Sequence, residues 1–241
     1  MNTIEIKNLT KQFKNVTAVD SLNLNISESE FFGLLGSNGA GKTTTIKMLC
    51  GLLAPSNGDA IMMGHSLVND SEAVKQLINI SPQETAIASH LTVKENLMLV
   101  ARLYGTDKEL AKQKVNRIIE DFHLKEYENV RSKNLSGGWQ RKLSIAMSLI
   151  TNPKILFLDE PTLGLDVRAR NDLWKTIEKL KGKATIILTT HYLEEAEALA
   201  DRICIMNQGK IQVMGSAKEI VEKTGAKNFE EAFLINTEEV H

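Results

Sequence analysis

One eight-residue segment, residues 36–43, limits what this chain can fold into more than any other feature. It reads Gly-Ser-Asn-Gly-Ala-Gly-Lys-Thr and fits the pattern G-x-x-x-x-G-K-[ST]. The pattern requires a buried strand before it and a helix after it. An unbroken apolar run at 31–35 supplies the strand, and residues 44–52 are predicted to form the helix. The segment therefore predicts a phosphate-binding loop in an α/β domain.

The residue types of this loop suit a polyphosphate. Glycines let backbone N–H groups approach the phosphates closely because no Cβ intervenes, and the helix that follows adds its positive end. Lys42 is expected to reach the β- and γ-phosphates, and the Thr43 hydroxyl to ligate Mg²⁺. The alternative is a glycine-rich turn that only starts a helix. The predicted nucleotide-binding residues are Gly36, Ser37, Asn38, Gly39, Ala40, Gly41, Lys42, Thr43 and Thr44.

Two carboxylates end a second apolar run at 155–158. A desolvated carboxylate is costly unless a cation or hydrogen-bond donors meet it, so packing alone does not explain this ending. In a P-loop enzyme Asp159 is expected to help hold Mg²⁺, and Glu160 is the candidate general base for an attacking water. A solvated strand end is the alternative.

The strand patterns divide the chain into two kinds of sheet. Residues 4–7 and 21–26 alternate polar and apolar, which predicts half-exposed antiparallel strands at the N-terminus. The apolar runs at 31–35, 155–158 and 185–188 are unbroken, as expected of parallel strands covered on both faces. Residues 203–213 suggest a closing hairpin.

Helical periodicity replaces the strand pattern between about 84 and 151. Thr92 and Glu95 form a predicted capping box at the start of the first helix. A second helix carries Ala111, Val115 and Phe122 on one face. Pro153 is expected to end a third. We expect one domain over 1–241, with a core at about 1–83 and 152–220, a helical insertion at about 84–151 and a short C-terminal segment at 221–241.

Composition excludes several classes of protein. A hydrophobic fraction of 42% and a charged fraction of 24% are typical of globular proteins, and a net charge of −1 gives no field that would attract nucleic acid or anionic lipid. No apolar run approaches the roughly 18 residues that span a bilayer, and the first residues lack a signal-peptide pattern. We therefore expect a soluble, cytosolic chain without a nucleic-acid partner. Cys50 and Cys204 are expected to be reduced, buried thiols.

A Leu-Ser-Gly-Gly segment at 135–138 precedes the third predicted helix. Ser136 is a good N-cap residue, and the two glycines leave the first N–H groups of the helix open. The segment is therefore a second potential anion site. The chain contains one P-loop lysine, so only one of its two potential anion sites has such a lysine.

These motifs resemble the ATP-binding cassette (ABC) ATPases, and the likeness runs from residue 4 to about residue 215. Leu-Ser-Gly-Gly is the signature of that family and is rare outside it. The resemblance implies a P-loop NTPase core with a parallel sheet, an antiparallel β N-terminal subdomain and an inserted α-helical subdomain. Other family elements occur in order: Phe13, Gln83 after Ser81 and Pro82, Pro161, Leu165, Asp166, and His191 after Thr189 and Thr190.

The resemblance also implies roles for these residues. Phe13 would pack on adenine, Gln83 would contact Mg²⁺ and water and sense a membrane subunit, and His191 would contact the γ-phosphate. Ser136, Gly137 and Gly138 would close on the ATP of the opposite subunit. Each residue alone has a plainer interpretation: Phe13 as core, Gln83 as a loop amide, His191 as a helix cap. At the ends of successive strands they favour a ligand site.

The sequence departs from the family pattern at two positions, Trp139 in place of the commoner Gln and Phe13 in place of the commoner Tyr. Neither change removes a phosphate donor or a catalytic carboxylate. Because Glu160 and His191 are both present, we expect hydrolysis rather than a site that only binds nucleotide.

The family implies a head-to-tail dimer, a homodimer or a heterodimer, with ATP between the loop of one subunit and the signature of the other. It also implies a separate transmembrane permease at the cytoplasmic face of the cell membrane. Residues 190–197 and 229–234 resemble the exporters with ABC-2-type permeases. The alternative is a soluble ABC ATPase acting on nucleic acid, ribosomes or a protein complex. Such proteins usually carry a second cassette or a long insert.

Overall fold

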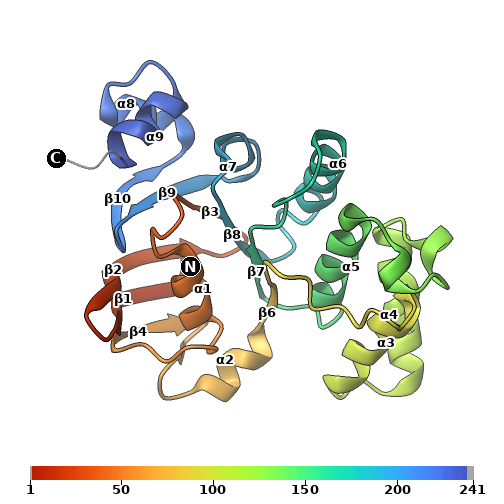
Figure 1. The fold of residues 1–241 in the computed structure, drawn as a ribbon. Helices are drawn as coiled ribbons and strands as arrows, with labels where there is room; N and C mark the ends of the chain where they lie inside the picture. The colour runs from red at the N-terminus through yellow and green to blue at the C-terminus, as the bar shows by residue number, and fades with distance from the viewer. Residues whose placement is uncertain (1, 238–241) are drawn as a thin grey trace.

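Residues 2–237 are described by the computed structural model, which contains two sheets surrounded by helices (Figure 1). The first sheet is antiparallel and has the order β2-β1-β4-β5. Its strands are β1 (Asn2–Phe13), β2 (Val16–Ser27), β4 (Asn57–Met62) and β5 (His65–Ser66). Along β2 the apolar Leu22, Leu24 and Ile26 are buried while Asn23 and Asn25 between them are exposed. The predicted half-exposed N-terminal strands are therefore confirmed.

The second sheet is mainly parallel and has the order β10-β9-β3-β8-β7-β6. Its strands are β3 (Phe31–Gly36), β6 (Ile78–Ser81), β7 (Ile155–Asp159), β8 (Thr185–Thr190), β9 (Arg202–Asn207) and β10 (Lys210–Gly215). β3 pairs in parallel with both β8 and β9, and β7 lies between β8 and β6. β10 returns antiparallel to β9. The three unbroken apolar runs are therefore parallel strands, as predicted, with β8 between β3 and β7. The predicted closing hairpin is also confirmed.

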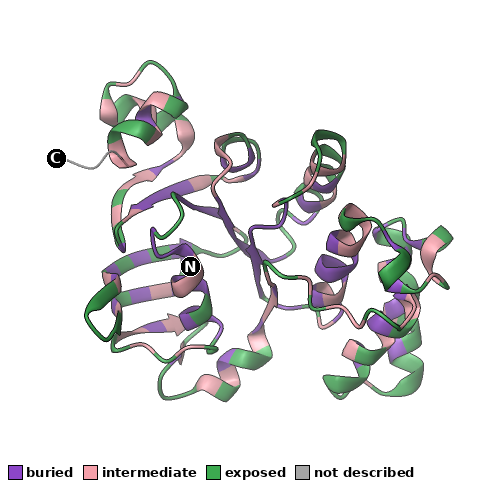
Figure 2. Cartoon of the chain, in the orientation of Figure 1, coloured by how far each residue is buried: buried purple, intermediate pink, exposed green. Residues whose placement is uncertain are grey.

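Side chains of this sheet alternate between two hydrophobic cores. Phe32 and Phe157 pack with the N-terminal sheet and α1 (Lys42–Leu49). Leu156 and Leu158 belong to the core under the helices on the other face. Both faces are covered, so β3, β7 and β8 are buried along their whole length (Figure 2). Burial on two sides explains why their sequences are apolar without alternation.

Three helices form the segment predicted as an insertion: α3 (Val93–Leu103), α4 (Lys108–Asp121) and α5 (Gly137–Leu149). Two short turns, η1 (Lys125–Tyr127) and η2 (Ser132–Asn134), connect α4 to α5. The capping box of Thr92 and Glu95 is present at the start of α3. α5 ends at Leu149, before Pro153, so the proline lies beyond the helix rather than at its last turn.

Several helices differ from the sequence expectation or were not predicted. α1 covers Lys42–Leu49 instead of 44–52, because Gly51 adopts φ +67° and ends the right-handed path. Helices α2 (Ser71–Leu77), α6 (Val167–Glu178) and α7 (Leu193–Leu199) had no prediction. The chain then forms α8 (Ala217–Thr224) and α9 (Phe229–Thr237), which pack with β9 in a third core. Residues 238–241 of the predicted C-terminal segment lie outside the described residues.

The sequence also led to expectations about the two cysteines and about membrane-spanning segments. Cys50 and Cys204 are free thiols, and both are buried. Burial raises the pKa of both thiols, so they remain protonated and unreactive at neutral pH. Within residues 2–237, no helix is both long and apolar enough to cross a bilayer.

Candidate nucleotide-binding site

The predicted phosphate loop connects β3 to α1, at the carboxyl edge of the parallel sheet. Gly41 is the N-cap of α1 and adopts φ +103°, a conformation that residues with a side chain rarely reach. Packing also restricts this loop: a Cβ at Gly36 would lie 2.5 Å from the carbonyl oxygen of Met206, and one at Gly41 would lie 2.6 Å from that of Ala18. The loop can follow this path only with glycine at both positions.

Lys42 is the buried cation around which the loop curls. Its Nζ donates to the carbonyl oxygens of Gly36 at 2.7 Å and Ser37 at 3.2 Å, and lies 3.6 Å from Oε1 of Glu160. Burial lowers the pKa of Lys42, and the negative charge of Glu160 opposes that decrease. The ammonium group is therefore held inside the loop, where phosphate oxygens would also bind.

Asp159 ends β7 with its side chain buried and hydrogen-bonded. Its Oδ1 accepts from the hydroxyl of Thr189 and lies 3.5 Å from that of Thr43. Burial raises the pKa of Asp159, and the Thr189 hydrogen bond opposes the increase. A carboxylate kept here at the cost of desolvation suits a cation beside it.

Glu160 follows in a left-handed backbone conformation, with φ +48°. Its amide donates to the carbonyl oxygen of Thr189 at 3.1 Å, which ties the strained turn to β8. The carboxylate is buried, with Oε2 2.7 Å from Nδ1 of His191 and Oε1 facing Lys42. The turn thus directs the Glu160 carboxylate back between a lysine and a histidine.

These groups line one pocket with a volume of about 290 Å³. It contains most of the predicted site: the loop from Asn38 onward, Gln83, Glu160 and His191. Gly36, Ser37 and Asp159 lie behind it and contact Lys42 or Thr43. The lining residues are Ala18, Asn38, Gly39, Ala40, Gly41, Lys42, Thr43, Thr44, Gln83, Glu160, Leu163 and His191.

The other predicted residues are not brought to this pocket. Phe13 is 45% exposed near the turn between β1 and β2, with Lys11 Nζ 5.2 Å from its ring centre. Ser136 and Gly138 line a separate pocket of about 220 Å³ together with Asp166 of the loop before α6. Gly137 is the first residue of α5 and lines neither pocket.

The prediction that Ser136 is the N-cap residue of α5 is confirmed for its position. Ser136 occupies the N-cap position, but its hydroxyl makes no hydrogen bond to the helix. The side chain is therefore available to a ligand in the second pocket.

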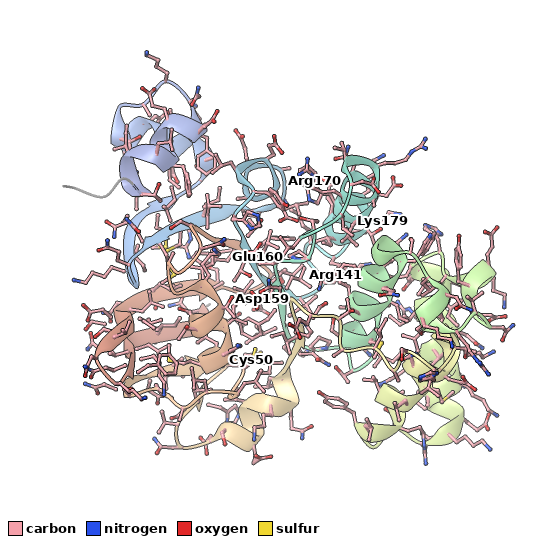
Figure 3. The ribbon with its side chains drawn as sticks, in the orientation of Figure 1. Cys50, Arg141, Asp159, Glu160, Arg170 and Lys179 are labelled. Atoms are coloured by element: carbon pink, nitrogen blue, oxygen red, sulfur yellow. The ribbon has the colours of Figure 1, made fainter. Side chains whose placement is uncertain are left out.

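Arg141, on α5, is a site residue that sequence reasoning missed. It is 5% exposed and donates to the carbonyl oxygens of Pro82 at 2.6 Å and Gln83 at 2.5 Å, and it lies 3.5 Å from that of Glu160. Figure 3 shows it beside Asp159 and Glu160 where α5 meets β7. Arg141 fixes the chain around Gln83 to the end of β7. Its position in the helix after the signature was the only signal in the sequence.

A magnesium ion fits the donors at the end of β7. The Thr43 hydroxyl and the Asp159 carboxylate are neighbouring oxygen groups, which is the ligand type that Mg²⁺ prefers. Over residues 2–237 no group of three or more His, Cys, Asp or Glu side chains could hold a metal. A magnesium ion here would therefore take its remaining ligands from phosphate and water, as it commonly does.

The comparison with protein families decides the relationship. The family model described as "ABC transporter" matches residues 19–163, which include the phosphate loop, the signature and both carboxylates. The chain belongs to the ABC transporter family. The family, the fold class and a nucleotide-binding role, as predicted from the motifs, are thereby confirmed.

Individual ABC relatives cover nearly all of the chain. The phospholipid-transporting ATPase ABCA3 of Homo sapiens is 41% identical over 92% of this chain, which spans 13% of that protein. The daunorubicin/doxorubicin resistance ATP-binding protein DrrA of Streptomyces peucetius is 39% identical over 92% of this chain, which spans 68% of it. A solved ATP-binding subunit of an ABC transporter has a TM-score of 0.86 at 27% identity, covering 98% of this chain and 100% of its own.

Proposed function

We propose that this chain binds and hydrolyses MgATP and thereby powers transport through a membrane-spanning permease on a separate polypeptide. The observation that carries the proposal is the convergence of Lys42, Glu160 and His191 on one pocket at the carboxyl edge of the sheet. Ligands of α/β sheets bind at this edge. If the Lys42–Glu160 ion pair served only to stabilise the fold, it would not need a phosphate-binding loop around it.

The loop residues would bind the phosphates. Helix α1 begins at Lys42 and contributes Lys42, Thr43 and Thr44 to the pocket, so the positive end of its dipole would face the phosphates. Mg²⁺ held by Thr43 and Asp159, with Gln83 nearby, would neutralise charge on the β- and γ-phosphates. Phe13 would stack on the adenine from outside the pocket.

Hydrolysis would use the carboxylate of Glu160 as general base. Lys42 Nζ lies 3.6 Å from Oε1 of Glu160. Phosphate oxygens in the loop would compete for the lysine, which leaves Oε1 free to accept a proton from the attacking water. His191 would hold Oε2 at 2.7 Å, so that Oε1 faces the pocket, and would contact the γ-phosphate.

A second subunit would complete each site. Ser136 and Gly138 line a pocket distinct from that of Lys42, so one chain presents two separate half-sites. A head-to-tail dimer, of two copies or of a copy and a paralogue, would bring each signature onto the ATP held by the other loop. A solved relative at 25% identity, the cassette MJ0796 bound to ADP and Pi, is dimeric.

The permease would be of the ABC-2 type or similar, and transport would be export at the cytoplasmic face of the cell membrane. The names of the relatives support this: one is a drug-resistance ATP-binding protein, and another transports phospholipid. The core at 1–83 and 152–220 would hold nucleotide, and the helical segment 84–151 would contact the permease. Arg141 would link that segment to Gln83.

The test is co-purification of the tagged chain from its native membranes. We expect a multi-span membrane protein to be retained with it, and we expect vanadate-sensitive ATPase activity in the complex. Retention of ribosomes, nucleic acid or a soluble complex instead, with no membrane protein, would contradict the transport proposal. The Lys42→Ala variant serves as the control for background ATPase.

A further inference from the structure

Side chains fasten α6 to α7 at three points. The Trp174 Nε1 group donates to Oε1 of Glu195 at 2.9 Å. Arg170 lies 3.5 Å from Oε2 of Glu194, and its guanidinium carbon is 5.2 Å from the ring centre of Tyr192. Figure 3 shows Arg170 on α6, beside α7 and above Glu160. The two helices are therefore joined by polar contacts as well as by packing.

Glu195 is the buried member of this group. It is 0% exposed, and its Oε2 has no hydrogen-bond partner among the described residues. The hydroxyl of Thr162, which is 1% exposed, is also without a partner there. An unpaired buried polar atom costs about 1–3 kcal/mol, and two such atoms near each other are the kind of pair that one water, hydrogen-bonded to both, satisfies.

Thr162 and Glu195 lie close enough to interact. Burial raises the pKa of Glu195, whereas the nearby Thr190 hydroxyl, the Trp174 indole N–H and the Thr162 hydroxyl oppose the increase. The negative charge of Glu160 raises it further. A Glu195 carboxyl that carries a proton has both an acceptor for Trp174 and a donor for a threonine hydroxyl.

The position of Glu195 connects the two half-sites. α7 starts two residues after His191, which contacts Glu160 in the phosphate pocket. Thr162 follows Glu160 by two residues, and the loop that it begins reaches Asp166, which lines the pocket of Ser136. α6, which Trp174 anchors, supplies more of that wall, including Ala169.

We propose that Glu195 is a positioning residue that couples the His191–Glu160 pair to the Ser136 pocket, through Thr162 and Trp174. The inference rests on the proposed ATPase function. When nucleotide changes the position of His191, the α7 helix moves with it. Glu195 passes that movement to the loop after Glu160 and to α6, which together form one wall of the half-site used by the second ATP.

The coupling predicts a specific pattern in four variants. Glu195→Ala should lower kcat about tenfold, the effect of one lost buried hydrogen bond, and should reduce the Hill coefficient for ATP toward about 1. Thr162→Val, which removes only the hydroxyl, should do the same, and the double variant should lose no more than either alone. Glu195→Gln should keep near-normal values because its amide offers the same acceptor and a donor.

Glu197→Ala is the matched control, because Glu197 is an exposed glutamate on the same helix and makes none of the α6–α7 contacts described above. It should retain the normal Hill coefficient and kcat. MgATP affinity of the single chain should change less than about twofold in all variants, since none of them touches the phosphate loop. Thermal melting checks that each variant is folded, and Thr162→Val carries the test if Glu195→Ala does not fold.

The outcomes separate this inference from the function on which it rests. A normal Hill coefficient and kcat in Thr162→Val overturn the coupling, as does a Glu195→Gln variant as defective as Glu195→Ala. If the unmodified protein hydrolyses ATP in either case, the proposed function survives. Absence of ATPase activity in the unmodified chain with its permease overturns both.

Discussion

At the scale of single residues, the phosphate pocket concentrates buried charge. Lys42, Asp159 and Glu160 are each at most 6% exposed, although charged side chains are rarely buried without close partners. Burial lowers the pKa of Lys42 and raises that of Asp159, so the charged form of each group is less stable here than in water. A nucleotide and its metal would add counter-charges to the one that Lys42 and Glu160 already provide for each other.

Lys42→Ala tests the role of this lysine. The variant should bind MgATP at least about tenfold more weakly, because it loses the charge-assisted contacts to the phosphates. Isothermal titration of the purified chain measures the affinity. Lys47→Ala is the control, since Lys47 is an exposed lysine on the same helix. Equal affinities in Lys42→Ala and the unmodified chain would remove the lysine from the site.

Glu195 predicts a pH dependence of stability. Its pKa is raised from 4.5 in the folded chain, so the folded state binds the proton more tightly than the unfolded state. The corresponding stability is present in full below the unfolded pKa and is lost as the pH rises through the raised folded pKa. Glu160 and Arg141 are the charged groups that act on Glu195 from neighbouring elements.

Glu195→Gln does not titrate at this position. It should therefore gain unfolding free energy relative to the unmodified chain as the pH rises from about 4.5, and the difference should be smallest in acid. Urea unfolding of both proteins at a series of pH values measures this. Parallel pH profiles would show that the carboxyl has the same pKa in both states.

At the scale of elements, α3 and α5 begin with the same kind of residue and use it differently. The Thr92 hydroxyl oxygen accepts a hydrogen bond from the amide of Glu95 at 3.2 Å, and the Glu95 carboxylate accepts one from the amide of Thr92 at 2.8 Å. Ser136 makes no such bond. A helix that leaves its N-cap hydroxyl unused keeps its first N–H groups available for an anion.

Thr92→Ala and Ser136→Ala should therefore have opposite consequences. Thr92→Ala should cost about 1 kcal/mol of unfolding free energy and leave ATP hydrolysis nearly unchanged. Ser136→Ala should change stability by less than about 0.5 kcal/mol, as at an exposed position, but lower the ATPase rate. Urea unfolding and a phosphate-release assay measure the two effects. A large loss of stability in Ser136→Ala would mean that the serine does cap the helix.

The elements that were predicted from sequence are those whose burial leaves a local pattern. β3, β7 and β8 are covered on both faces and are apolar throughout, while α3 carries a capping box. The strand β4 has the sequence Asn-Gly-Asp-Ala-Ile-Met, and only its second half is apolar. It is a strand because β1 pairs with it, which is a long-range cause that no window of sequence contains.

The same division applies to the site. Residues 36–43, Asp159 and Glu160 were found because the phosphate loop and the acidic strand end are contiguous in sequence. Arg141 and Thr189 were not assigned a role, because their contacts to Gln83 and Asp159 join segments that lie far apart in the chain. The roles of Phe13 and of the signature residues stay predictions, since they depend on a nucleotide and a second subunit.

At the scale of the whole molecule, the two half-sites occupy separate pockets of one chain. In a single copy, the phosphate loop lines one pocket and the signature residues Ser136 and Gly138 line the other. Under the proposed function, contact of nucleotide with both pockets would require two copies to associate, and the bound ATP would become part of their interface.

Glu160→Gln should make this association visible. Loss of the base should slow hydrolysis roughly 10²–10⁴-fold, while Lys42 and the loop still bind ATP, so the dimer should persist. Size-exclusion chromatography with light scattering should detect a dimer with MgATP and a monomer with MgADP. Normal turnover by a monomeric Glu160→Gln variant would refute both the base and the dimer.

The separation of the two pockets has a genetic corollary. A defect in the loop of one copy and a defect in the signature of the other would fall on the same composite site. In a mixed pair one site inherits both lesions and the other inherits neither. Two variants that are each inert alone should then restore part of the lost turnover when they are combined.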